Sequence, residues 1–62
     1  MKYTTGNCIR NTVKKNYGNG DMVDINTKGK VLKVYELSKS YTVFFQGTAM
    51  PHRILEIQLK DC

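Results

Sequence analysis

The residue types that carry most enzyme chemistry are few and poorly spaced in this sequence of 62 residues. His52 is the only histidine, and its neighbours Pro51 and Arg53 indicate a solvent-facing turn residue rather than a general base. Asp21 and Asp24 lie three residues apart in a predicted strand, so their side chains should point to opposite faces and cannot share a proton or a metal. We therefore expect no catalytic residues and no enzyme activity.

Metal, cofactor and membrane sites have equally little support. Cys8 and Cys62 are separated by most of the chain, so with one histidine they do not form metal-ligand pairs of the C-x-x-C type. Residues 18–21 (Gly-Asn-Gly-Asp) precede a predicted strand, not the helix that a phosphate-binding loop requires. No apolar run approaches the roughly 20 residues that cross a bilayer. Met1 is followed by no apolar segment typical of secretory signals, so we expect a cytoplasmic protein with both cysteines reduced.

Basic charge is the main functional signal. The formal net charge is +5, and the first 20 residues contribute +4 of it, because they hold four bases and no acid. The remaining residues hold six bases and five acids. Basic residues gathered on one face are the electrostatic signature of a surface that binds a polyanion. The alternative interpretation is a lysine-rich surface that only keeps a small domain soluble.

Exposed aromatic rings would complement this charge. Alternation along the predicted strands places Lys33, Tyr35 and Phe44 away from the core, and nucleobases stack on exposed rings for about 1 to 3 kcal/mol each. The predicted nucleic-acid-binding residues are Arg10, Lys14, Lys15, Lys33, Tyr35, Phe44 and Arg53. Alternatively, Phe44 packs beneath the amino-terminal segment, and the binding surface moves to the loop ends. That surface would hold Lys28, Lys30, Lys39, His52 and Arg53.

Short strands must position these residues. Apolar and polar residues alternate between Gly and Pro breaks from residue 21 to residue 59, which predicts five strands. They span about residues 22–25, 30–37, 41–46, 48–50 and 55–59. Simple alternation cannot bury both Val31 and Val34, so we expect a bulge or bend at residues 32–33. The predicted core comprises Val23, Ile25, Val31, Val34, Val43, Phe45, Ile54, Leu55 and Ile57.

Residues 1–19 differ from the rest of the chain and form a basic amino-terminal segment, packed on the barrel or flexible, ahead of a β-barrel domain at residues 20–62. Ile9, Val13 and Tyr17 recur at a spacing of four, which predicts a short helix over residues 7–16. Alternatively, β-favouring threonines make this segment an arm laid along a sheet edge. Residues 17–20 (Tyr-Gly-Asn-Gly) predict a turn in either case.

The order of motifs resembles the Tudor/KOW group of small Src homology 3-like barrels. These folds open the first strand with Gly-Asp-x-Val and the second with Lys-Gly-x-Val. Their third strand reads aromatic-x-Val-x-Phe, and Pro-x-x-x-Leu-Glu joins the fourth strand to the fifth through one tight turn. The corresponding motifs here occupy residues 20–23, 28–31, 41–45 and 51–56. The resemblance covers residues 20–59 and implies a mainly β, five-stranded barrel.

The resemblance also implies a binding role. This group includes RNA-contacting transcription and ribosomal modules, DNA-binding retroviral integrase domains, methyl-lysine readers and protein adaptors. The chain contains no Trp, which disfavours the aromatic cage of a reader. We expect a small basic module that contacts nucleic acid or a nucleoprotein complex with little sequence specificity. The alternative is a protein-interaction module, such as a regulator or phage-type accessory protein that docks on a larger host enzyme or assembly. No small-molecule substrate, cofactor or membrane is expected.

Overall fold

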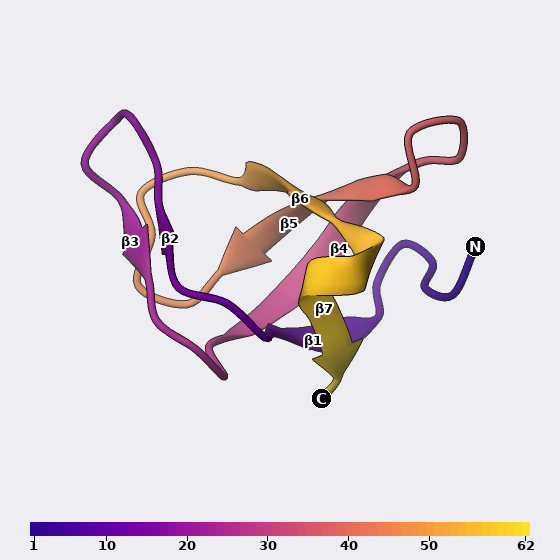
Figure 1. Ribbon diagram of the computed structural model, residues 1–62, viewed down its shortest axis with the longest axis horizontal. Helices are drawn as coiled ribbons and strands as arrows, with labels where there is room; N and C mark the ends of the chain where they lie inside the picture. Colours follow the sequence, from indigo (N-terminus) through magenta and orange to yellow (C-terminus); the bar gives the residue numbers. More distant parts are fainter.

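The computed structural model describes residues 1–62 and is mainly β, as the sequence predicted (Figure 1). Its elements are β1 (Cys8–Asn11), β2 (Lys15–Asn16), β3 (Met22–Val23), β4 (Lys28–Tyr35), β5 (Ser40–Phe45), β6 (His52–Leu55), the 3₁₀ helix η1 (Glu56–Gln58) and β7 (Leu59–Asp61). Five strands form an antiparallel sheet in the order β6-β5-β4-β1-β7, and β2 and β3 form a separate ribbon. No helix has the length and apolar character needed to cross a bilayer.

The connection between the two edges of the sheet is very short. The edge strands β6 and β7 are joined by η1 alone, as Figure 1 shows. They are not paired with each other, so the sheet remains open. The strand predicted at residues 55–59 is therefore wrong in position, because η1 interrupts the alternation and the last strand begins at Leu59. Ile57 in η1 is 86% exposed, and Leu59 takes the core position instead.

The amino-terminal segment contains no helix, so the helix predicted over residues 7–16 is wrong. Residues 8–11 form β1, which lies inside the sheet between β4 and β7. Ile9 is fully buried opposite Gly29, where a Cβ atom would lie 2.6 Å from Cγ1 of Val43. The spacing of four was misleading because Ile9 lies in β1, whereas Tyr17 packs against the core from the turn that follows β2. Pairing between distant segments decided the structure here.

The strand predicted at residues 22–25 is reduced to two residues that pair with β2 outside the main sheet. The chain then turns through Asn26, whose φ is +69°. Buried Asn11 holds this turn, because its side-chain oxygen accepts a hydrogen bond from the Thr27 N–H at 2.8 Å. Ile25 is consequently 58% exposed, so its predicted core position is wrong. The strand predicted at residues 48–50 is also absent.

The predicted bulge in β4 is confirmed. Val31 pairs with Val43, but the next pair is Lys33 with Thr42, so Leu32 is an extra residue. The bulge changes the phase of alternation along the strand. Val31 is fully buried and Val34 packs against the core, while Lys33 points outward.

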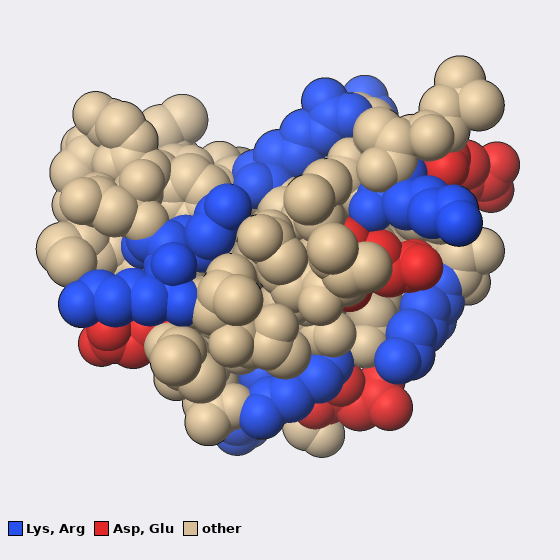
Figure 2. Space-filling model, in the orientation of Figure 1, with Lys and Arg blue, Asp and Glu red and all other residues tan.

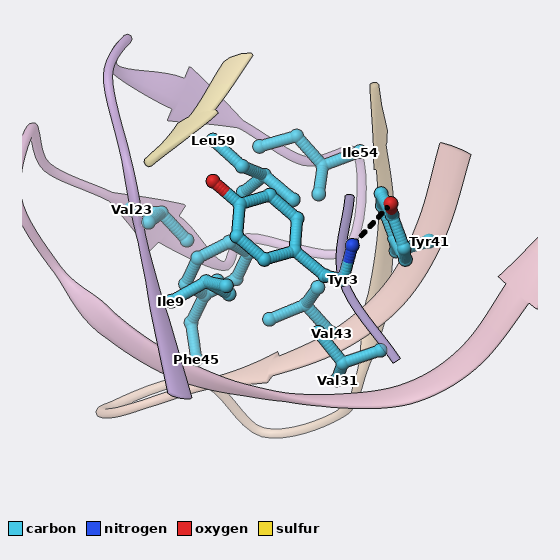
Figure 3. Close-up of a cluster of buried hydrophobic side chains, with 9 residues drawn as sticks. All are labelled: Tyr3, Ile9, Val23, Val31, Tyr41, Val43, Phe45, Ile54 and Leu59. Carbon is cyan, nitrogen blue, oxygen red and sulfur yellow. Dashed lines mark hydrogen bonds between the residues drawn. The ribbon is translucent and has the colours of Figure 1, made fainter. Parts of the chain in front are cut away.

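The core is a cluster of nine buried hydrophobic residues (Figure 3). They are Tyr3, Ile9, Val23, Val31, Tyr41, Val43, Phe45, Ile54 and Leu59. Five of the nine predicted core residues are in this cluster, whereas Leu55 is 46% exposed because Ile54 points inward on the same short strand. Tyr3 was missed. Its ring points into the middle of the group, and its N–H donates to the Tyr41 hydroxyl at 3.0 Å (Figure 3).

A disulfide joins Cys8 to Cys62 across a sequence separation of 54 residues. Ile9 pairs with Asp61, so continuing the β1–β7 register by one residue places the two cysteines directly opposite each other. Their Cα atoms are 5.3 Å apart, which suits a disulfide. The expectation of two reduced thiols is therefore wrong for this structure. The sequence does not reveal that β1 and β7 are neighbours.

Candidate nucleic-acid interface

Arg53, on edge strand β6, is the most constrained basic residue of the predicted site. Its guanidinium carbon lies 3.9 Å from the centre of the Tyr35 ring. Its Nε donates to Ser40 Oγ at 3.0 Å, and its Nη2 donates to Ser38 Oγ at 2.9 Å. The ion pairs of the structure do not include it. Neutral groups thus orient the guanidinium and leave its charge uncompensated.

The sheet register places a second cation beside Arg53. Lys33, Thr42 and Arg53 form a row across three neighbouring strands, since Thr42 pairs with both of the others. The Lys33 ammonium lies 5.4 Å from the centre of the Tyr35 ring. The Tyr35 hydroxyl is hydrogen-bonded to Thr42 Oγ1 at 2.9 Å, which fixes the ring. Two cations therefore contact one immobilised ring, and an anion bound there would relieve their mutual repulsion.

A shallow groove of about 180 Å³ adds Lys15 to this pair. Lys15 and Arg53 both line it, together with the hydroxyl-bearing side chains of Ser38 and Ser40. The Tyr17 hydroxyl is 3.5 Å from the Arg53 carbonyl oxygen, which links the β2–β3 ribbon to β6. Figure 2 shows basic side chains in a diagonal band over the region of β6 and β2, with acidic side chains below and to the right of it. The ribbon thus extends the basic surface beyond the sheet.

Phe44 lies on the same outer face, two residues along β5 from Thr42. It is 42% exposed and pairs with Lys30 on β4. A hollow of about 230 Å³ beside it is lined by Cys8, Lys28, Gly29, Lys30, Phe44 and Gln46. Phe44 is therefore not covered by the amino-terminal segment, so the alternative prediction that it packs beneath that segment is wrong.

The other two predicted residues lie apart from Arg53. Arg10 pairs with Lys28 and with Lys60 in the sheet, and its Nη1 donates to the Asn26 carbonyl oxygen at 2.6 Å. Lys14 does not line the groove, and its ammonium lies 3.9 Å from the Asp24 carboxylate. Both partners of that ion pair are exposed, so it contributes little to the stability of the fold. The Asp24 carboxylate nevertheless compensates the charge of Lys14. The structure brings together Lys15, Lys33, Tyr35 and Arg53.

Sequence reasoning missed a cluster next to this surface. His52 Nε2 lies 2.7 Å from Asp21 Oδ2, and the side chains are only 10% and 11% exposed. The imidazole stacks on the Tyr17 ring, with centroids 3.8 Å apart and planes 5° from parallel. The prediction that His52 faces solvent is wrong, because the β2–β3 ribbon covers it. The one available signal was the turn at residues 17–20, which is confirmed by the Gly20 N–H donating to the Tyr17 carbonyl at 3.1 Å.

This cluster fixes the ribbon to the strand that carries Arg53. The Asp21 carboxylate also accepts hydrogen bonds from the Ala49 N–H, at 3.0 and 3.1 Å to its two oxygens. The hydrogen bond with His52 is the main reason that the pKa of Asp21 falls from 3.8 to about 2, and the Ala49 N–H lowers it further. The charged carboxylate is thus the form that the fold favours.

Comparisons with protein-family models, with curated proteins and with solved structures find no match for this chain.

Proposed function

We propose that this protein is a small basic binding module that contacts nucleic acid or a nucleoprotein complex with little sequence specificity, and that it is not an enzyme. The observation that carries the proposal is the Arg53 guanidinium, held by the Tyr35 ring and two serine hydroxyls with no carboxylate partner. A planar guanidinium oriented in this way matches the geometry of a phosphate. Phosphate contacts position a protein on nucleic acid but read no sequence.

The charge of the whole outer face supports the same function. Register and alternation place six basic residues on it, while Ile9, Leu59 and Val43 mark the inner face. The six are Arg10, Lys28, Lys30, Lys33, Arg53 and Lys60. No acidic residue occupies a strand position on this face. Glu36, in the turn after β4, lines a neighbouring hollow with Arg53 but forms no ion pair with it.

We further propose that the fold is an Src homology 3-like barrel of the Tudor/KOW kind. The sheet order, the bulge in β4 and the 3₁₀ turn between the last two strands support this assignment. In this proposal β1 is the first strand. The Gly-Asp-x-Val motif at residues 20–23 therefore does not open the first strand as expected, but lies at β3 of the β2–β3 ribbon, an excursion before the second strand. The cytoplasmic location stays a prediction, and trapping free thiols with an alkylating reagent in intact cells would test it. A reducing cytoplasm should break the Cys8–Cys62 disulfide and leave both thiols modified, whereas an intact disulfide in cells would contradict this location.

Binding of labelled oligonucleotides at about 50 and about 200 mM salt tests the proposed function. Lys15→Gln should weaken binding and reduce the slope of log affinity against log salt by about 1, because one phosphate contact is lost. Lys14→Gln is the matched control, since Lys14 is the adjacent lysine but lies against Asp24 outside the groove. It should change neither quantity. Absence of binding at the lower salt would reject the proposal.

A protein partner is the second candidate, and exposed apolar residues around Arg53 favour it. Leu37 is fully exposed and Leu55 is 46% exposed, and each lines a hollow that Arg53 also lines. A partner with an apolar surface and a carboxylate would fit this arrangement. Leu37→Ser and Leu55→Ser should weaken capture of such a partner while leaving oligonucleotide binding unchanged. Loss of oligonucleotide binding in the same variants would count against separate roles.

A further inference from the structure

Phe44 has the only aromatic ring in the chain that is left without an aromatic, cationic or core partner. Tyr3, Tyr41 and Phe45 are buried. The Tyr17 ring is stacked on His52, and the Tyr35 ring is occupied by Arg53. Phe44 is 42% exposed on the outer face of β5, whereas its sequence neighbours Val43 and Phe45 face inward and are fully buried.

We propose that the ligand of this face is single-stranded nucleic acid, DNA or RNA, with one unpaired base stacked on the Phe44 ring. This inference rests on the proposed function. The hollow beside the ring is lined by Lys28 and Lys30, which place positive charge beside the stacked base, and by the polar side chain of Gln46. Rings flanked by basic residues are the usual platform for single strands, because every base has a face that can stack.

The spacing between the ring and Arg53 suits one continuous strand. Thr42 pairs with Arg53 and lies two residues from Phe44. Phe44 and Arg53 are therefore about 7 Å apart in the direction of the strands and about 5 Å apart across neighbouring strands. A base on Phe44 and a phosphate on Arg53 can therefore belong to neighbouring nucleotides. The Lys15 groove continues the path of positive charge beyond Arg53, and Lys33 adds a cation on the opposite side of Thr42, on β4.

A duplex does not satisfy this arrangement. Its bases are stacked on each other and offer only their edges in the grooves, so a ring on an open sheet face cannot stack on them unless a base leaves the helix. A duplex would use the basic residues alone. Single-strand preference and dependence on the Phe44 ring are therefore linked consequences of one geometry.

The test uses a labelled DNA of about 12 nucleotides, the same sequence as RNA, and the DNA annealed to its complement. Both single strands should bind more tightly than the duplex. Phe44→Leu, which keeps an apolar side chain but removes the ring, should weaken single-strand binding by about 5- to 150-fold and leave duplex binding unchanged. Because stacking is not ionic, the salt slope should stay as in the wild type. Ile57→Ala, at an exposed position on η1, is the control.

A fluorescent reporter gives an independent measurement. The chain contains no Trp, so Phe44→Trp places a single indole at the proposed stacking position. Single strands should bind this variant at least as tightly as the wild type and quench its fluorescence, whereas the duplex should not. Equal affinity for duplex and single strand, or unchanged binding by Phe44→Leu, would overturn this inference and leave the proposed function standing. If none of the three oligonucleotides binds at about 50 mM salt, both are overturned.

Discussion

His52 Nε2 and Asp21 Oδ2 lie 2.7 Å apart between the β2–β3 ribbon and the first residue of β6. This contact joins the part of the chain that carries Lys15 to the strand that carries Arg53. It is reinforced by the stacking of His52 on Tyr17. The groove that both basic residues line depends on this attachment, although neither His52 nor Asp21 lines it.

The lowered pKa of Asp21 predicts a loss of stability in acid. Its pKa is about 2 in the folded chain, below the ordinary value of 3.8, mainly because of the hydrogen bond with His52. The unfolded chain therefore binds a proton first as the pH falls, so the contribution is fully present above about pH 4 and is lost toward pH 2. Glu56 acts in the same direction, since the hydrogen bond from Tyr41 lowers its pKa.

Thermal unfolding of Asp21→Asn and the wild type between pH 2 and pH 6 measures this effect. The variant should be less stable than the wild type at pH 6, and the difference should shrink as the pH approaches 2. Glu56→Gln provides a second, independent case with the same sign. Parallel stability curves for Asp21→Asn and the wild type would contradict the proposed role of the carboxylate.

The disulfide should contribute much of the stability of so small a domain. Cys62→Ser should lower the free energy of unfolding by about 2 to 4 kcal/mol, because the unfolded chain loses its cross-link. Cys8→Ser should have a similar effect, and the double variant should be no worse than either single one. Urea unfolding with and without reductant measures this. Reductant should destabilise the wild type but not the variants, and an unaffected wild type would exclude a stabilising cross-link.

Local pattern identified the strands whose neighbours are close in sequence. The run from Tyr41 to Phe45 was assigned correctly because its period of two is uninterrupted, and Val31 with Val34 revealed the bulge. β1 was missed because its partners, residues 28–30 and residues 59–61, are distant in the chain. The same reason explains the disulfide and the His52 cluster. The β2–β3 ribbon folds over β6 to cover His52, and an alternation of apolar and polar residues does not predict a contact of this kind.

The phase of β5 also has a stability consequence. Val43 is fully buried and Thr42 lies on the outer face, so Val43→Ala should cost about 2 kcal/mol, from lost burial and the cavity left behind. Thr42→Ala removes only a half-buried hydrogen bond with Tyr35 and should cost clearly less. Chemical denaturation of both variants compares them directly. Equal losses would mean that burial on this strand does not follow its alternation.

Tyr35 and Arg53 form one unit in the structure, whereas the sequence predicted that each would contact nucleic acid separately. Because Arg53 covers the Tyr35 ring, we expect Tyr35 to orient the guanidinium rather than to stack on a base. Arg53→Lys keeps the charge but loses the planar fork that Ser38 and Ser40 hold. Oligonucleotide affinity should fall while the salt slope stays nearly constant, whereas Arg53→Gln should lower both.

Tyr35 variants separate this orienting role from a simple loss of folding. Tyr35→Phe keeps the ring and removes only the hydroxyl contact with Thr42, so binding should stay close to that of the wild type. Tyr35→Leu removes the ring beneath Arg53 and should weaken binding by about 2- to 5-fold, the range of an exposed cation–π contact. In an Arg53→Lys background the further loss from Tyr35→Leu should be smaller, because the stacked guanidinium is already gone. Additive losses in that double variant would show that Tyr35 contacts the ligand by itself.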